Sequence, residues 1–176
     1  MAGLRRGIAY RKVVRAYTRR SKFKKKGFIK SIPNPKIVKY DMGDGKKGYE
    51  YRVDLISKDK IQIRHNAIES ARLIVNRKLN EKFGNTGYFL KIRLYPHHVL
   101  RENKMLTGAG SDRMQTGMQK AFGKVVGIAA QVKKNQILMS AYVNKNQIDT
   151  TRKILKTASP KLPCKCGVVI NEIKSD

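Results

Sequence analysis

Apolar and polar positions alternate over much of the chain after residue 35. The clearest case is the segment 88–95 (YFLKIRLY), where three aliphatic residues alternate with Lys91 and Arg93. A period of two residues is typical of a half-buried strand. Similar patterns, bounded by turn residues, predict further strands at 36–41, 51–57, 61–65, 99–106, 125–132, 136–143 and 166–173.

Short turn signals separate these strands. Gly43-Asp44-Gly45 predicts a turn between the first two strands, and Pro96 ends the segment 88–95. Lys133-Lys134-Asn135 lies between two apolar runs and predicts a hairpin of 125–132 with 136–143.

Two segments have helical spacing instead. Apolar residues recur every three or four positions from Ala67 to Leu79. Asn66 with Glu69 three residues later predicts an N-terminal capping box, and Gly84 predicts the C-terminal end. A second helix is predicted at 147–157, ended by the prolines that follow it.

Strands outnumber helices in this pattern, and hairpins outnumber βαβ crossovers. The predicted fold class is therefore α+β, a mostly antiparallel sheet with two helices on one face. A length of 176 residues corresponds to about one domain. We expect an extended basic N-terminal arm at 1–35 and a single globular domain at 36–176, with a mobile Gly-rich loop at 104–117.

Charge narrows the class of partner. The chain has 40 Lys and Arg against 12 Asp and Glu, a formal net charge of +28, which indicates a nucleic-acid partner. A hydrophobic content of 40% still allows a folded core.

No window approaches the roughly 18 apolar residues of a membrane span, and the basic N-terminus leads into no signal-peptide core. With only two cysteines, a reducing cytoplasm is expected.

The arm is predicted to contact RNA. Its first thirty residues contain twelve Lys and Arg and no acid, with Tyr10, Tyr17, Phe23 and Phe28 interspersed. Cations would neutralise phosphates while rings stack on unpaired bases, and the arm would become ordered on binding. The predicted RNA-contacting residues are Arg5, Arg6, Tyr10, Arg11, Lys12, Arg15, Tyr17, Arg19, Arg20, Lys22, Lys24, Lys25 and Lys26.

The segment 103–124 (NKMLTGAGSDRMQTGMQKAFGK) is the second candidate RNA contact. It contains four glycines and a single acid, and its loop is longer than a connection between strands requires. Its methionines are either core residues or adaptable RNA contacts. The cations expected to contact phosphate are Arg101, Lys104, Arg113, Lys120 and Lys124; amides that could bind bases or riboses are Asn103, Gln115 and Gln119; and the glycines that allow close approach are Gly108, Gly110 and Gly117.

Catalytic and cofactor sites are poorly supported. Gly108-Ala109-Gly110 does not complete a dinucleotide fingerprint, because position 113 is arginine. His97, His98 and Glu102 offer the histidines and the carboxylate of an acid–base RNA-cleaving site, but no catalytic carboxylate cluster accompanies them. Cys164 and Cys166 have the wrong spacing for a zinc knuckle. We expect no enzyme, no cofactor and no small-molecule substrate.

Several motifs together resemble a known family. HVLRENKM (98–105), GAGSDR (108–113), GM (117–118) and AFGK (121–124) closely resemble the large-subunit ribosomal protein family L ten-e of archaea and eukaryotes, whose bacterial counterpart is L sixteen. AYTRR (16–20), IPNPKI (32–37) and KLP (161–163) are similar to its archaeal form. The similarity runs from about residue 10 to the C-terminus.

This resemblance implies an α/β-hammerhead-like fold that binds large-subunit rRNA beneath the central protuberance. It also implies that the loop 104–117, flanked by Arg101 and Lys124, points toward the peptidyl-transferase centre and helps to position A- and P-site tRNA. The implied partners are rRNA, tRNA and neighbouring ribosomal proteins, in the cytoplasmic ribosome. The chain departs from the family at Gly7, where proline is usual, and in the lysine-rich segment 21–30. A transient RNA chaperone or assembly factor is the alternative.

Overall fold

A computed structural model of the chain describes residues 5–13, 23, 25, 29, 31–103, 108–109, 117–119 and 121–173. Its strands are β1 (Asp41–Gly43), β2 (Tyr51–Ser57), β3 (Ile61–Arg64), β4 (Phe89–Ile92), β5 (His98–Glu102), β6 (Lys124–Val132), β7 (Ile137–Val143) and β8 (Cys166–Glu172). Its helices are α1 (His65–Phe83) and α3 (Ile148–Lys156), with short 3-10 turns η1 (Gly7–Tyr10), η3 (Lys145–Gln147) and η4 (Ser159–Lys161).

Five strands form the main sheet in the order β1-β4-β7-β2-β8. Every pairing in it is antiparallel. β2 is bonded along its length on both sides, so that Tyr51 lies opposite Val143 of β7 and opposite Glu172 of β8. The predicted antiparallel arrangement is confirmed.

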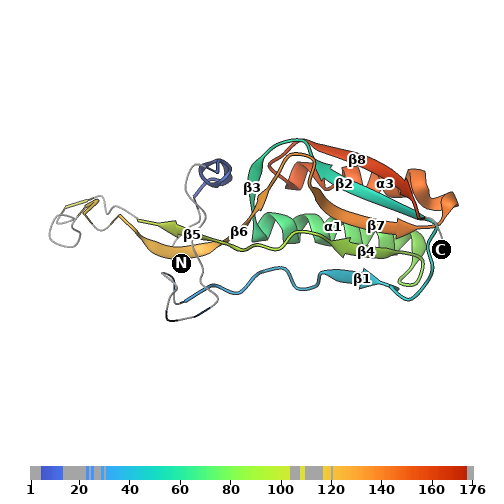
Figure 1. Cartoon of the computed structure of the whole chain (residues 1–176), viewed down its shortest axis with the longest axis horizontal. Coiled ribbons are helices and arrows are strands. Elements are labelled where there is room, and N and C mark those ends of the chain that lie inside the picture. The colour runs from blue at the N-terminus through green and yellow to red at the C-terminus, as the bar shows by residue number, and fades with distance from the viewer. Residues whose placement is uncertain are drawn as a thin grey trace.

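One face of this sheet carries the core. Val53, Leu55 and Leu90 are fully buried and belong to one cluster with residues of both helices, including Val75 of α1 and Leu155 of α3. Both helices lie on the same side of the strands (Figure 1). The α+β class with two helices on one face is therefore confirmed, because alternate apolar positions of the strands meet the apolar stripes of the helices.

The remaining three strands form a second sheet, ordered β3-β6-β5. The C-terminal part of β6 pairs with β3, and its N-terminal part pairs with β5. The predicted hairpin of 125–132 with 136–143 is wrong, because β6 and β7 belong to different sheets. The turn itself exists: Asn135 has a φ of 61° and Gln136 donates its N–H to the Lys133 carbonyl at 3.2 Å. A period of two residues predicts a strand but does not identify its partner.

The predicted strand at 36–41 is also wrong for most of its length, because β1 begins only at Asp41. The preceding residues lie along α1 instead. The N–H of Lys36 donates to Nδ1 of His65, and the N–H of Val38 donates to Oε2 of Glu69, both at 3.4 Å. Side chains of the helix therefore satisfy backbone groups that a sheet partner would otherwise satisfy.

The ends of α1 differ in how well they were predicted. The capping box of Asn66 with Glu69 is wrong, since the helix begins at His65 and its N-cap Arg64 makes no side-chain capping bond. Glu69 pairs with Arg72 instead. At the other end the prediction is confirmed: Gly84 has a φ of 67° and donates its N–H to Asn80.

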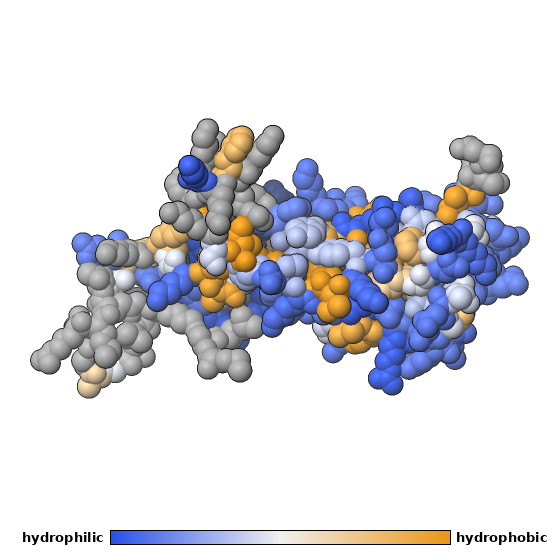
Figure 2. Space-filling model, turned by 90° about the horizontal axis from the view of Figure 1, so that it is seen from below, coloured by the Kyte–Doolittle hydropathy of each residue, from blue (hydrophilic) through white to orange (hydrophobic). Residues whose placement is uncertain are grey.

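The β5–β6 hairpin projects from the body of the molecule at one end (Figure 1). η1 lies beside this hairpin, whereas α1, α3 and the main sheet form the body. Hydrophilic residues cover most of the face seen from below, with hydrophobic residues in a few small groups (Figure 2). Within the described ranges, every helix is too short or too polar to cross a membrane.

Candidate nucleic-acid interface

The N-terminal segment is attached to the edge of β3. The N–H of Gln62 donates to the carbonyl of Arg11, and the side-chain amide of Gln62 donates to the carbonyl of Tyr10, both at 3.0 Å. Two bonds from one strand residue thus fix the turn η1 against the second sheet. This places the described part of the basic arm next to the hairpin that carries the Gly-rich loop.

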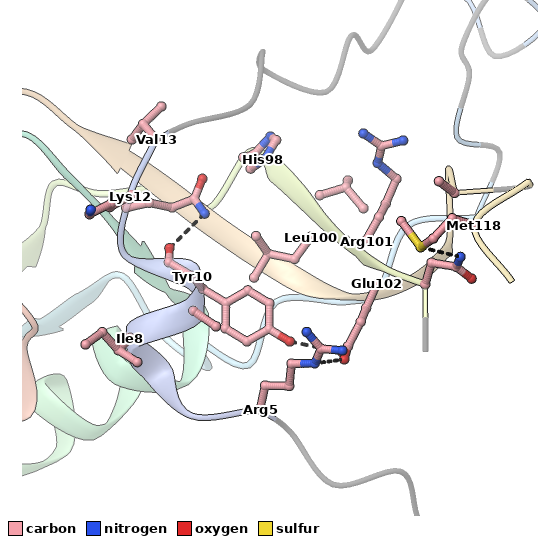
Figure 3. A pocket seen from close by; sticks show the side chains of 15 residues that line it. Arg5, Ile8, Tyr10, Lys12, Val13, His98, Leu100, Arg101, Glu102 and Met118 are labelled. Atoms are coloured by element: carbon pink, nitrogen blue, oxygen red, sulfur yellow. Dashed lines mark hydrogen bonds and ion pairs between the residues drawn. The ribbon is translucent and has the colours of Figure 1, made fainter. Parts of the chain in front are cut away.

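Glu102, at the end of β5, makes the second attachment. Its carboxylate accepts a hydrogen bond from the Tyr10 hydroxyl at 3.1 Å and forms an ion pair with Nε of Arg5. Figure 3 shows both groups converging on this carboxylate from the N-terminal side. The guanidinium of Arg64 lies over the Tyr10 ring, 5.3 Å from its centre. Burial, and then the bond to Glu102, raise the pKa of Tyr10.

A groove of about 600 Å³ lies between this N-terminal segment and β5. Side chains of Arg5, Lys12 and Arg101 reach its lining, together with apolar groups such as Ile8 (Figure 3). The only carboxylate in the described lining, that of Glu102, is already paired with a cation. The groove therefore presents net positive charge beside apolar surface, a combination that suits a phosphate backbone with unstacked bases.

Contacts between the two ends of the loop form its base. The guanidinium of Arg101 stacks over the Phe122 ring at 3.8 Å and donates to the Phe122 carbonyl at 3.5 Å. Asn103 donates its side-chain N–H to the carbonyl of Gly117 at 3.3 Å. Because Phe122 is 54% exposed, the free side of its ring is available for stacking.

Gly123 is required at this base. Its φ is 73°, and a Cβ there would lie 2.5 Å from the carbonyl carbon of Glu102. The backbone at Gly123, just before β6, passes too close to the end of β5 for any side chain, so glycine is needed there.

The structure brings part of the predicted RNA-contacting set together. Arg5, Tyr10 and Lys12 of the arm line the same groove as Arg101 and Asn103 of the hairpin. Other predicted residues are described but lie outside the groove lining: Arg6, Arg11, Lys25, Gly108, Gly117, Gln119 and Lys124. The rest of the set lies outside the described residues: Arg15, Tyr17, Arg19, Arg20, Lys22, Lys24, Lys26, Lys104, Gly110, Arg113, Gln115 and Lys120.

Four residues of the site were missed as contributors from sequence. They are Gln62, Arg64, Phe122 and Glu102, the last in its role as the carboxylate that pairs with Arg5 and Tyr10. Tyr10 and Glu102 are 92 positions apart, and no local pattern connects them. Phe122, beside a glycine in a basic segment, is an aromatic residue that could have been selected by the same reasoning as Tyr10.

The three residues of the RNA-cleaving hypothesis lie in different surroundings. The ring of His97 packs against Tyr95, with ring centres 4.6 Å apart. His98 is buried, and this burial, together with Arg101, lowers its pKa. The carboxylate of Glu102 is held by Arg5 and Tyr10. His97 and Glu102 are thus in contact with other groups, and His98 is buried.

Nor do the described residues assemble a zinc site. In the part of the chain that the structure describes, no three His, Cys, Asp or Glu side chains gather closely enough to hold a metal.

Of the loop methionines, Met118 is 58% exposed and lies 3.7 Å from the Asn103 amide, so it is not a core residue, whereas Met105 and Met114 lie outside the described residues.

Comparison with known proteins shows which family the chain belongs to. Residues 17–169 match the family described as ribosomal protein L16p/L10e, a span that includes the hairpin and its loop. The chain belongs to the ribosomal protein L16p/L10e family. The resemblance found from the motifs is thereby confirmed, and the expectation of a ribosomal protein rather than an enzyme agrees with this membership.

Archaeal relatives are similar over most of their length. The large ribosomal subunit protein uL16 of Staphylothermus marinus is 46% identical over 158 residues, covering 90% of this chain and 87% of the relative. The uL16 protein of Picrophilus torridus is 45% identical over 163 residues, covering 92% and 93%. That of Methanococcus maripaludis is 42% identical over 172 residues, covering 97% and 96%.

Proposed function

We propose that this L16p/L10e protein is a structural component of the large ribosomal subunit, where it binds rRNA and presents its Gly-rich loop near the peptidyl-transferase centre to help position A- and P-site tRNA. The observation that carries the proposal is the junction of the basic N-terminal segment with the β5–β6 hairpin. Residues far apart in sequence form one cationic groove there.

The electrostatics of the groove favour RNA over an acidic protein surface. Its cations lie next to exposed rings and apolar side chains, including Phe122 and Ile8. Phosphates would contact the cations, while bases or riboses would contact the rings, because single-stranded and irregular RNA exposes both groups. A net charge of +28 supplies a long-range attraction in addition to these contacts.

The loop has a different role in this proposal. Gly108 and Gly117 have positive φ values of 140° and 58°, and a Cβ at either would meet open space. These glycines therefore serve backbone conformation rather than packing. The base of the loop, held by Arg101 and Asn103, would position it as a unit.

Salt dependence tests the rRNA contact. The logarithm of the affinity for large-subunit rRNA should fall linearly with the logarithm of salt concentration, with a slope of about 0.7–0.9 per phosphate contact. Lys12→Ala should weaken binding and reduce the slope by about 1. Lys78→Ala, on α1 and outside this groove, is the matched control. A salt-independent affinity, or an equal effect of both variants, would contradict the proposal.

Residence on the ribosome distinguishes a structural component from a transient assembly factor. The tagged protein is sedimented with ribosomes through a high-salt gradient. One copy per large subunit that resists the salt wash supports the proposal. Release into the light fractions supports the assembly factor or a free RNA-binding protein.

A further inference from the structure

Two cysteines at the start of β8 form a close pair that the RNA-binding surface does not use. The Sγ atoms of Cys164 and Cys166 are 3.7 Å apart, and Sγ of Cys166 also lies 3.5 Å from the Cys164 carbonyl oxygen. Cys164 is buried, with 7% of its surface exposed, whereas Cys166 is partly exposed. Both are free thiols.

The backbone between them explains why the thiols face each other. The N–H of Lys165 donates to Oδ2 of Asp59, and its carbonyl accepts the N–H of Lys58, both at 2.9 Å. Both the N–H and the carbonyl of Lys165 are thus hydrogen-bonded to the turn between β2 and β3. These bonds fix the backbone between the cysteines, just before β8, in a position where the two sulfurs lie together.

One of the two thiols loses its proton more easily than an ordinary cysteine does. The Cys166 thiol can donate a hydrogen bond to the Cys164 sulfur, which lowers the pKa of Cys164 to about 7. The same bond, together with burial, raises the pKa of Cys166. Thiolates rather than thiols are the nucleophiles in disulfide exchange. The lowered pKa of Cys164 makes a thiolate more available near neutral pH than in an ordinary cysteine, with the Cys166 thiol beside it.

We propose that Cys164 and Cys166 are a redox-active dithiol, a modification site at which a small disulfide of the glutathione type converts the pair reversibly into an intramolecular disulfide. This inference is independent of the proposed function, because neither cysteine lines the groove at the hairpin.

The exchange takes two steps. The thiolate of the pair attacks one sulfur of the small disulfide, which forms a mixed disulfide and releases one small thiolate. The second cysteine loses its proton to solvent and attacks the protein sulfur of the mixed disulfide, which forms the Cys164–Cys166 bond and releases the second small thiolate. Counted from the dithiol, the protein loses two electrons and two protons, one proton when the first thiolate forms and one when the second cysteine ionises, and the oxidant gains the two electrons.

Proximity favours the second step. The sulfurs need to approach from 3.7 Å to the bond length of about 2 Å, and the attacking thiol is already beside its target. The ring closed by a disulfide between residues 164 and 166 is small. Such bonds are strained and remain open to reduction, as regulatory disulfides are.

The test uses the reduced full-length protein under native conditions with oxidised glutathione, followed by intact-mass spectrometry. The proposal predicts that the wild type loses two hydrogen atoms, retains no glutathione, and returns to its original mass with dithiothreitol. The variant Cys164→Ser keeps the more exposed Cys166 but has no second thiol. It should therefore retain one glutathione.

Two results would overturn the proposal. In the first, the native wild type keeps both thiols while the same chain oxidises in guanidinium chloride, which would show that the fold protects the pair. In the second, the wild type stops at a stable glutathione adduct, which would show that the second cysteine cannot reach the first. Both results are read on the wild type and so do not depend on a variant folding.

Discussion

The hydroxyl of Tyr10 donates a hydrogen bond to the carboxylate of Glu102, at 3.1 Å across 92 positions of sequence. Arg5 pairs with the same carboxylate, whose side chain is only 7% exposed. In a chain with 40 cations and 12 acids, this acid lies inside a cationic groove. Its position connects the N-terminal segment to the strand that leads into the loop.

The first prediction concerns this connection. Glu102→Gln keeps the side-chain volume but removes the charge that binds Arg5. Hydrogen bonds to charged groups contribute about 1.5–3 kcal/mol. Amide exchange at Gln62, whose N–H bonds to Arg11, should therefore become about tenfold faster or more, while the main sheet keeps its protection.

Glu172→Gln is the matched control, since Glu172 accepts a bond from Tyr51 at an exposed edge of the main sheet. It should leave exchange at Gln62 unchanged. If Glu102→Gln also leaves it unchanged, the backbone bonds of Gln62 alone hold the N-terminal segment.

The second prediction concerns a buried ion pair on α1. Arg72 donates to both oxygens of Glu69, at 2.8 and 2.6 Å, with side chains only 8% and 14% exposed. Glu69→Gln leaves the guanidinium buried without its anion, so the free energy of unfolding should fall by about 3 kcal/mol. Urea denaturation at pH 7 measures this change.

Glu81→Gln provides the control, because Glu81 pairs with Arg77 on the same helix with side chains 56% and 82% exposed. It should lower the free energy of unfolding by no more than about 0.5 kcal/mol. Equal losses in the two variants would mean that burial does not strengthen the Glu69 pair.

The same pair predicts a pH dependence. The hydrogen bond from Arg72 lowers the pKa of Glu69 below its ordinary value of 4.5. A lowered folded-state pKa means that the stabilisation is fully present above pH 4.5 and is lost as the pH falls through the folded pKa. The difference in unfolding free energy between wild type and Glu69→Gln should therefore shrink below pH 4.5.

Elements with a regular period were predicted well from sequence. α1, α3 and most strands lie where the apolar spacing placed them, because burial on one face decides which residues are apolar. The glycine end of α1 was also predicted, since a φ of 67° at Gly84 suits glycine. Such features depend on neighbours along the chain.

What could not be predicted depends on distant partners. β6 has the period of a strand, yet its pairing with β3 and β5 rather than β7 is decided by packing. Glu69 looked like a capping residue, but the buried Arg72 takes its carboxylate. The candidate site shows the same limit: Tyr10 and Arg101 were selected by residue type, whereas the pairing role of Glu102 is visible only in the fold. The division into an arm at 1–35 and a domain at 36–176 stays a prediction.

The third prediction tests the core of the main sheet. Ile92 is 4% exposed and belongs to the main hydrophobic cluster. Ile92→Asp would bury a carboxylate without a partner, so the free energy of unfolding should fall by several kcal/mol. Lys91→Ala, on the other face of β4, removes only a 3.8 Å surface pair with Asp41 and should change it by less than about 1 kcal/mol. Thermal melts of both variants give the comparison; similar midpoints would contradict the assigned face of β4.

The fourth prediction tests the base of the loop. Gly123→Ala places a Cβ 2.5 Å from the Glu102 carbonyl carbon and forces a residue with a side chain into positive φ. The hairpin should distort locally, with faster amide exchange in β5 and β6 and weaker binding of rRNA. Gly127→Ala, within β6, meets its nearest neighbour at an ordinary 3.7 Å and should leave exchange unchanged. Unaltered exchange in Gly123→Ala would show that the two strands separate there without difficulty.

The fifth prediction separates the loop from the fold. Deletion of residues 108–116 should leave the thermal midpoint and rRNA binding nearly unchanged but impair translation. The ends of the loop already meet where Asn103 bonds to Gly117 at 3.3 Å, so the shortened chain can close without moving β5 or β6. No residue of β5 and no described residue of the loop belongs to the main core cluster, and β6 contributes to it only at its far end, through Ala130 and Val132. The experiment compares melting, rRNA affinity at two salt concentrations, and peptide synthesis by ribosomes that carry the deletion. Loss of the folded state would refute the separation, and normal peptide synthesis would refute the role of the loop in positioning tRNA.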